Sequence, residues 1–188
     1  MRKTLKIILA VFLALAIFAA VGFSVVFLDV ASYTATSSQL LVGPPIMARA
    51  LVVYDPGLTG APKAFADDVA ARLQDDYNVE LAGIRSPAAT ANVSQYAIIV
   101  VGGPIYAGNP SASVKSYLGS LKPASEAIVG VFGVGSFNIP NEKVAPSASA
   151  NTLPIREEVK INTGGNFTSE ADNFAEALLL QPTLSPPP

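Results

Sequence analysis

Three apolar runs, the last of them containing one glycine, limit the fold of this chain more than any other feature. They are Ala50–Tyr54, Tyr96–Val101 and Ala127–Phe132, and a turn-forming Asp-Pro-Gly or a glycine follows each one directly. A strand that is apolar at every position is buried on both faces, as in a parallel sheet that helices cover from two sides. The runs therefore predict three central strands of an α/β domain.

Helix patterns lie between and after these runs, as a parallel sheet requires. Pro62–Gln74 predicts one helix. Asn109-Pro110 predicts the cap and first turn of a second helix, and Ser169 predicts the cap of a third. The apolar stripes of the three helices are Phe65, Val69 and Leu73; Val114, Tyr117, Leu118 and Leu121; and Ala171, Phe174, Ala175, Leu178 and Leu179.

Two weaker strand patterns complete the expected sheet. Tyr77–Gly83 predicts a shorter strand, and the alternating pattern of Glu158–Ile161 predicts a fifth strand at the sheet edge. Asn138–Pro154 contains three prolines and no helical stripe. An irregular loop is therefore expected where the fourth crossover helix would lie.

The N-terminal segment predicts a membrane anchor. Ile7–Leu28 contains only two residues outside the apolar set, and Arg2, Lys3 and Lys6 precede it. About 20 apolar residues span a bilayer, and clustered positive charge stays on the cytoplasmic side. A cleaved signal peptide is the alternative, but signal cores are only about 7–15 residues long. We expect an uncleaved single-pass anchor with a cytoplasmic N-terminus and an extracytoplasmic domain.

The predicted organisation has four parts. Residues 1–29 form the anchor, residues 30–48 a Ser/Thr-rich linker, and residues 49–180 the α/β domain. Residues 181–188 form a Pro-rich tail that is expected to be unfolded.

Composition excludes several kinds of chemistry. The absence of Cys and His excludes disulfides, thiolate nucleophiles, Cys-bound metal clusters and triads that contain His. A net charge of −2 without a basic run argues against nucleic acid as a partner. Asp67 and Asp68 are expected to lie on a solvated helix face, and no metal site is predicted. Chemistry in this chain is therefore expected to belong to a cofactor.

Three loops follow the predicted central strands, at the sheet edge where α/β proteins bind ligands. Asp55–Lys63 joins a strand to a helix, so its N–H groups, the Thr59 hydroxyl and Lys63 are candidates for holding a phosphate. Gly103–Pro110 offers the Tyr106 ring between glycines, and Gly133–Phe137 permits close approach of backbone. Each loop alone is equally well a simple turn; their shared position favours a binding site for a flat, phosphorylated cofactor.

The same loops resemble those of the flavodoxin family. Val100–Ser111, followed by Val114-Lys115, is similar to the second flavin-binding loop of archaeal and bacterial flavodoxin-domain proteins. Val53–Asp55 through Thr59-Gly60 resembles the family's phosphate loop, and Phe132–Gly135 resembles its third loop. The resemblance covers about residues 48–137 closely and residues 157–180 loosely. It implies a flavodoxin-like three-layer sandwich with a five-stranded parallel sheet in the order 2-1-3-4-5, and FMN as the cofactor.

The resemblance also implies roles for particular residues. The phosphate of FMN would contact the first loop, and the isoalloxazine ring would lie between the second and third loops. The residues so implied are Thr59, Gly60, Ala61 and Lys63 for the phosphate; Pro104, Ile105, Tyr106, Ala107 and Gly108 for one side of the ring; and Gly133, Gly135 and Ser136 for the other side.

The first loop departs from the family pattern. Pro56-Gly57 stands where Ser or Thr is usual, Ala61-Pro62 stands where Asn-Thr is usual, and the loop is one residue longer. These changes remove hydrogen-bond donors, each worth about 1.5–3 kcal/mol toward a charged group. We therefore expect weakened FMN binding, which Lys63 offsets in part.

Three functions fit the sequence. The first is a membrane-anchored FMN protein that transfers electrons to or from a redox partner protein or a quinone. The second is a flavin enzyme of the same fold, such as a quinone reductase or a protoporphyrinogen-oxidase-like enzyme. The third is a flavodoxin fold that has no cofactor and serves as an interaction module. The sequence leaves open whether the chain is an enzyme.

Overall fold

The computed structural model describes residues 2–45, 48–136, 144–146 and 153–180; in residues 2–5 and 23–29 it describes the backbone alone. The predicted tail, and most of the expected irregular loop at Asn138–Pro154, lie outside the described residues.

A mostly parallel sheet forms the centre of the domain. Its five parallel strands are β2 (Arg49–Tyr54), β3 (Asn78–Gly83), β4 (Ile98–Tyr106), β6 (Ile128–Gly135) and β7 (Ile155–Asn162). They lie in the order β3-β2-β4-β6-β7, with β7 at one edge. This arrangement confirms the predicted order 2-1-3-4-5.

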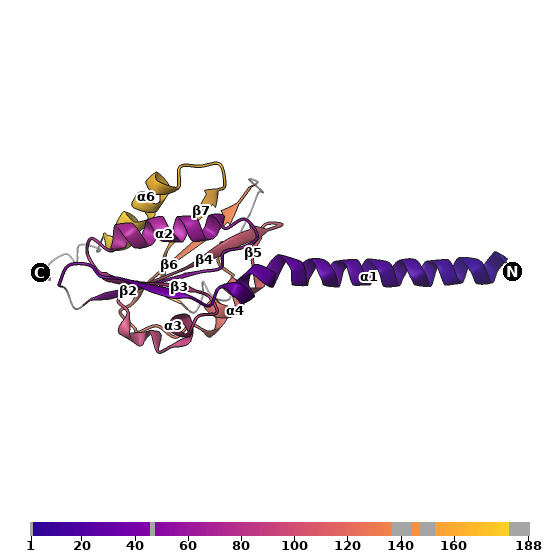
Figure 1. The fold of residues 1–188 in the computed structure, drawn as a ribbon, viewed down its shortest axis with the longest axis horizontal. Helices are drawn as coiled ribbons and strands as arrows, with labels where there is room; N and C mark the ends of the chain where they lie inside the picture. The colour runs from indigo at the N-terminus through magenta and orange to yellow at the C-terminus, as the bar shows by residue number, and fades with distance from the viewer. Residues whose placement is uncertain (1, 46–47, 137–143, 147–152, 181–188) are drawn as a thin grey trace, which may run out of the picture.

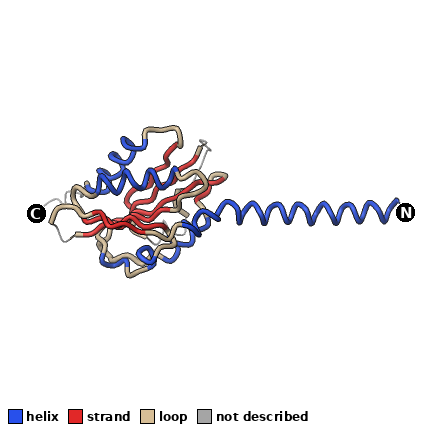
Figure 2. The backbone as a smooth tube through the Cα atoms, viewed as in Figure 1, coloured by secondary structure: helices blue, strands red, loops and turns tan. Residues whose placement is uncertain are grey.

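Helices cover both faces of the sheet (Figures 1 and 2). On one face lie α2 (Ala61–Leu73) and α6 (Phe167–Leu179), and on the other lie α3 (Pro87–Thr90), the short 3-10 helix η1 (Val93–Gln95) and α4 (Ala112–Ser120). The predicted three layers are therefore present.

Alternate residues of each central strand face the two layers. Val52 and Val100 are buried toward α2 and α6, whereas Val53 and Val101 are buried toward α3 and α4. Burial on both sides explains why these strands are apolar throughout.

The segment predicted to be a linker is largely structured, which corrects that prediction. The N-terminal helix α1 (Arg2–Thr34) continues past residue 30, and Ser38–Leu41 forms an edge strand, β1, antiparallel to β3. Three residues of β1 are exposed and the fourth is half-buried, so the strand lacks the apolar pattern by which strands are recognised.

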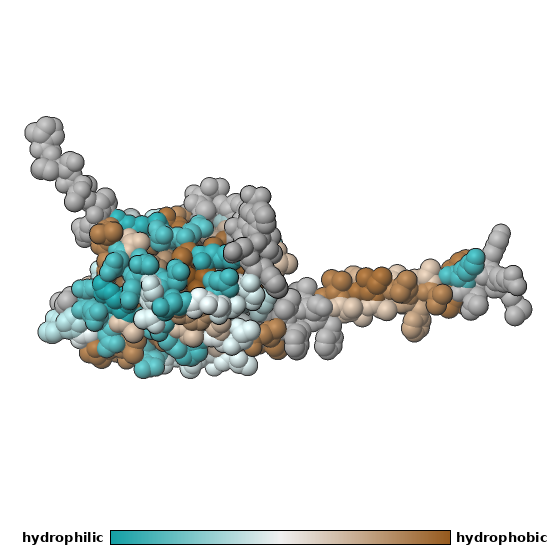
Figure 3. Space-filling view, turned by 90° about the horizontal axis from the view of Figure 1, so that it is seen from above, coloured by the Kyte–Doolittle hydropathy of each residue, from teal (hydrophilic) through white to brown (hydrophobic). Residues whose placement is uncertain are grey.

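Helix α1 extends away from the layered domain (Figure 1). Its described side chains from Ile7 to Val21 are exposed, and Phe18 is 81% accessible. Figure 3 shows the apolar surface that they form along the helix. Within the residues searched, no helix is long and apolar enough to cross a membrane. The structure thus does not support the predicted span.

The end of α1 is attached to the domain beside β3. The Gly83 N–H donates to the Ser37 carbonyl, and the Arg85 N–H donates to the Ala35 carbonyl, each at 2.9 Å. The Arg85 guanidinium lies 4.8 Å from the centre of the Tyr33 ring. Because Gly83 ends β3, α1 leaves the domain at the carboxyl edge of the sheet.

Two predicted helix caps are wrong. Asn109-Pro110 pairs with β4 as the short strand β5, and Ser111 caps α4 by accepting from the Val114 N–H. Asn166, not Ser169, caps α6 by accepting from the Ser169 N–H. In both places two residues that can cap a helix lie within three positions of each other. At α4, the pairing of Asn109-Pro110 with β4 leaves Ser111 as the cap.

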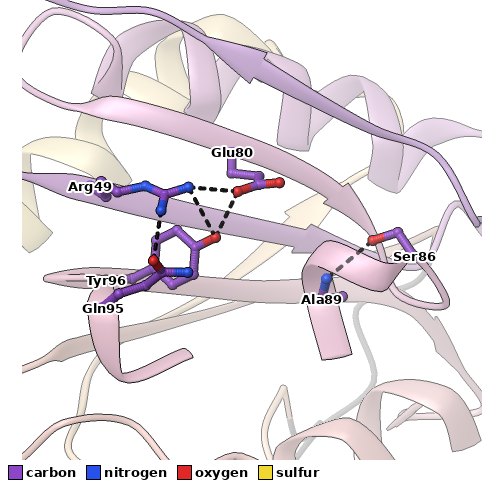
Figure 4. A network of polar contacts seen from close by, with 6 residues as sticks. All are labelled: Arg49, Glu80, Ser86, Ala89, Gln95 and Tyr96. Carbon is purple, nitrogen blue, oxygen red and sulfur yellow. Dashed lines mark hydrogen bonds and ion pairs between the residues drawn. The ribbon is translucent and has the colours of Figure 1, made fainter. Parts of the chain in front are cut away.

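A polar cluster joins the opposite, amino edge of three strands (Figure 4). Arg49 donates to Gln95 at 2.7 Å and pairs with Glu80 at 2.9 Å, and the Tyr96 hydroxyl donates to Glu80 at 2.7 Å. Nearby, the Ser86 hydroxyl caps α3 by accepting from the Ala89 N–H. The cluster fixes the start of β2 to β3 and to the chain entering β4.

Candidate functional site

Strand β4 runs further than the sequence predicted and ends in a hairpin. Gly102, Gly103 and Pro104 stay in register with β6, and Tyr106 pairs with Asn109 of β5. The two turn residues between them, Ala107 and Gly108, have φ values of 49° and 77°. Positive φ at both central positions is typical of a type I′ turn, which matches the twist of a hairpin. The expected second loop is therefore a rigid β-hairpin.

Strand β6 also runs further than the sequence predicted. Strand β6 extends to Gly135, and the Thr163 N–H at the end of β7 donates to the Gly135 carbonyl at 3.2 Å. The Thr163 hydroxyl lies 3.2 Å from that of Ser136. Phe137 lies outside the described residues.

The ends of the three strand–loop segments surround one groove of about 400 Å³, which we call the three-loop groove. Ligand pockets in proteins have volumes of roughly 300–1,000 Å³. Within the part of the chain that the structure describes, the lining is uncharged and mainly apolar: Leu58, Thr59, Pro62, Pro104, Ile105, Tyr106, Ala107, Val134, Gly135, Ser136 and Thr163.

Seven of the twelve predicted site residues line this groove: Thr59, Pro104, Ile105, Tyr106, Ala107, Gly135 and Ser136. Gly60, Ala61 and Lys63 instead lie at the beginning of α2, and Gly108 lies in the hairpin turn. Gly133 is buried, and a Cβ added there would come 2.5 Å from the Ile105 side chain. Gly133 therefore makes room for Ile105 and does not line the groove.

Four lining residues were absent from the sequence prediction: Leu58, Pro62, Val134 and Thr163. Leu58 and Pro62 belong to the first loop, but the prediction considered only polar and backbone groups there. Thr163 follows β7, so applying the strand-end rule to the fifth strand would have indicated it.

Tyr106 lies against the first loop. A Cβ added at Gly57 would come 3.2 Å from the Tyr106 hydroxyl and 2.9 Å from the Pro104 ring. Gly57 also has a φ of 58°, which favours glycine. The hairpin and the first loop are thus in direct contact at one end of the groove.

Three backbone donors of the first loop are bonded within the loop. The Gly57 N–H donates to the Asp55 carboxylate at 3.0 Å, the Gly60 N–H to the Pro56 carbonyl at 3.1 Å, and the Ala61 N–H to the Thr59 hydroxyl oxygen at 3.3 Å. Pro62, the second residue of α2, has no N–H. A phosphate at this position would compete with existing hydrogen bonds for each of these three donors.

Lys63, the predicted counter-charge, points along its own helix. Its ammonium pairs with both carboxylate oxygens of Asp67 at 2.8 and 2.9 Å and lies 5.6 Å from the centre of the Tyr54 ring. The hydrogen bond with Asp67 raises the pKa of Lys63, against a smaller opposing effect of burial. Asp68, which with Asp67 was expected on a solvated helix face, accepts a hydrogen bond from the Thr168 hydroxyl at 3.3 Å.

A buried carboxylate lies beneath the first loop. Asp55 is only 1% exposed, and its second oxygen accepts from the hydroxyls of Ser111, at 2.7 Å, and Ser113. Ser111 and Ser113 lie at the beginning of α4, where the helix dipole favours a negative charge. Asp55 therefore fixes the first loop to α4 and places a negative charge at the base of that loop.

The groove fits one half of FMN better than the other. Apolar walls formed by Pro104, Ile105 and Val134 suit a flat ring system, with the hydroxyls of Ser136 and Thr163 at one side. The first loop fits a phosphate less well, because the N–H groups of Gly57, Gly60 and Ala61 are bonded within the loop and the buried Asp55 lies at its base.

No protein-family model and no curated protein matches this chain. Solved structures do match. A flavodoxin of Streptococcus pneumonia TIGR4 superposes with a TM-score of 0.53 at 19% identity, covering 70% of this chain and 97% of that one. Flavodoxin 2 from Bacillus cereus gives 0.52 at 18% identity, covering 70% and 98%. The apo form of an NADH:FMN oxidoreductase gives 0.53 at 13% identity, covering 74% and 92%. These similarities show a flavodoxin-like fold.

Proposed function

We propose that this flavodoxin-like chain binds a flavin by its ring in the three-loop groove and transfers electrons. The observation that carries the proposal is the convergence of the ends of β2, β4 and β6 on one uncharged groove of about 400 Å³. Open α/β sheets bind ligands at this position.

The residues of the groove would position the ring and exclude water. Pro104, Ile105 and Val134 offer apolar contact, and the Tyr106 ring offers an aromatic edge. The hydroxyls of Ser136 and Thr163 are close enough to each other to bond together to one polar ring edge. When bound, the flavin itself supplies the redox chemistry.

The visible absorption of the full-length chain tests the proposal. Purified chain titrated with FMN and with riboflavin should show the spectral change of a bound ring for at least one of them. Ser136→Trp, which places a large side chain at the exposed rim of the groove, should weaken that binding at least tenfold. Ser125→Trp, at an exposed position before β6 and outside the groove, is the matched control and should leave binding unchanged. Absence of binding of both flavins would contradict the proposal.

Carrier and enzyme are distinguished by turnover. A flavin-dependent quinone reductase, or a protoporphyrinogen-oxidase-like enzyme, would convert its small substrate with the flavin-loaded chain alone. A carrier would require a redox partner protein. We favour the carrier.

A fold without cofactor that serves as an interaction module is the second candidate. The internal hydrogen bonds of the first loop favour it, because they stabilise the loop without a ligand. In that case neither flavin would bind, and neither would raise the melting temperature.

We further propose from the sequence that the chain is membrane-anchored, with its N-terminus cytoplasmic and its domain extracytoplasmic. The support is the run Ile7–Leu28 behind Arg2, Lys3 and Lys6, together with the exposure of the described apolar side chains of α1. An exposed apolar surface of this size on a helix is typical of a site that contacts a membrane or another protein. Attachment to a membrane would raise the effective concentration of the domain near a quinone or a membrane redox protein.

A further inference from the structure

We infer that the three-loop groove selects a flavin without phosphate, so that riboflavin binds at least as tightly as FMN. The inference rests on the proposed function, because it concerns which flavin the same groove accepts. Three observations carry it: the bonded donors of the first loop, the buried Asp55 and the uncharged lining of the groove.

The first observation concerns hydrogen bonds. Three N–H groups of the first loop, those of Gly57, Gly60 and Ala61, already donate to acceptors of the same loop. A phosphate could use them only by displacing an equal number of bonds, so the exchange brings little net gain. The Thr59 hydroxyl accepts from the Ala61 N–H and keeps its own proton for donation.

The second observation concerns charge. The Asp55 side chain is 1% exposed, and it accepts hydrogen bonds from the Gly57 N–H and from the hydroxyls of Ser111 and Ser113. A phosphate above it would bring like charges together in a partly desolvated place, where repulsion is stronger than in water. Such a base suits an uncharged ligand better than an anion.

The third observation concerns the lining. Each of the eleven described residues that line the groove is uncharged. Lys63 lies outside this set and is paired with Asp67. Since a surface pair of this kind contributes little, release of Lys63 is easy, but one mobile ammonium does not offset both the bonded donors and Asp55.

Paired titrations of the full-length chain, purified in a mild detergent, test the inference. Riboflavin should bind with a dissociation constant equal to or lower than that of FMN. FMN binding tenfold tighter than riboflavin would overturn the inference and leave the proposed function standing. Absence of binding of both flavins would overturn the proposed function and the inference with it.

A gain of phosphate binding tests whether the first loop is responsible. The variant Ala61→Asn adds a carboxamide to the first loop at a position that does not line the groove. We expect it to tighten FMN binding at least tenfold while riboflavin binding changes less than twofold. Ala64→Asn adds the same carboxamide at an exposed position on α2 beyond the loop and should change neither. Tighter binding of both flavins, or of neither, would overturn the assignment to this loop.

Discussion

At the scale of single residues, Tyr96 links the stability of the domain to pH. Its side chain is 2% exposed, and its hydroxyl donates to Glu80 at 2.7 Å. Burial, and next the hydrogen bond to Glu80, raise the pKa of Tyr96 to about 12. A raised pKa in the folded state means that the folded chain keeps this proton when the unfolded chain has already released it.

Stability should therefore fall as the pH rises from about 10, the pKa of an unperturbed tyrosine, toward 12. Below pH 10 the contribution of Tyr96 is fully present. Urea unfolding at pH 9 and pH 11 measures the loss. Tyr96→Phe should be about 1 kcal/mol less stable at pH 9, since it removes a hydrogen bond to a carboxylate. The variant should also lose less stability between the two pH values; an equal loss in both proteins would contradict the prediction.

Asp55 shows what the sequence could not predict at this scale. It was recognised as the end of a strand, but its partners Ser111 and Ser113 lie 56 and 58 positions along the chain. Ser111 lies at the beginning of α4, after the Asn109-Pro110 strand that pairs with β4. Hydrogen bonds between distant segments have no local pattern, so the caps and the closed first loop required the structure.

At the scale of elements, the pattern of apolar residues predicted the buried strands, because such a pattern reports burial. The buried strands β2, β4 and β6 were found because burial on both faces requires apolar residues throughout. The strand β1 was missed because it is mostly exposed, so its sequence does not need the apolar pattern of a buried strand. The extensions of β4 and β6 were interpreted as loops because of their glycines, which here permit close packing of Phe132 and Ile105.

The β4–β5 hairpin allows a test of its turn. Ala107 adopts a φ of 49°, a left-handed conformation that costs a non-glycine residue about 1–2 kcal/mol. Glycine removes this cost. It also raises the conformational entropy of the unfolded chain, which lowers the free energy of unfolding by about 0.4–1 kcal/mol. Ala107→Gly should therefore stabilise the chain by about 0.5–1 kcal/mol in urea unfolding.

Gly108→Ala is the opposite change at the neighbouring position, where φ is 77°. It should destabilise the chain by about 1 kcal/mol for the same reason. If both variants shifted stability in the same direction, the turn would not have the described conformation.

At the scale of the whole molecule, the proposed membrane location depends on α1. If the proposed anchor is correct, the chain should remain in the membrane fraction after extraction at alkaline pH. Leu13→Arg with Phe18→Arg should move it to the soluble fraction, because each Arg near the centre of a spanning helix costs about 2.5–3.5 kcal/mol. Leu13→Ala with Phe18→Ala changes the same positions without charge and should leave the chain in the membrane. Wild-type chain in the soluble fraction would contradict the anchor.

The place where α1 leaves the domain lies on the same side of the sheet as the three-loop groove. The residues just after its last turn are attached beside Gly83, at the carboxyl edge of the sheet, and α1 extends away from the domain there (Figure 1). The lining residues of the three-loop groove lie at the ends of strands at that same edge. The Arg49 cluster occupies the other edge. A membrane or protein that buries the apolar side chains of α1 would therefore lie on the same side of the domain as the groove. An exchange partner would have to belong to that surface or enter sideways between it and the domain, so access to the groove would be a search in two dimensions.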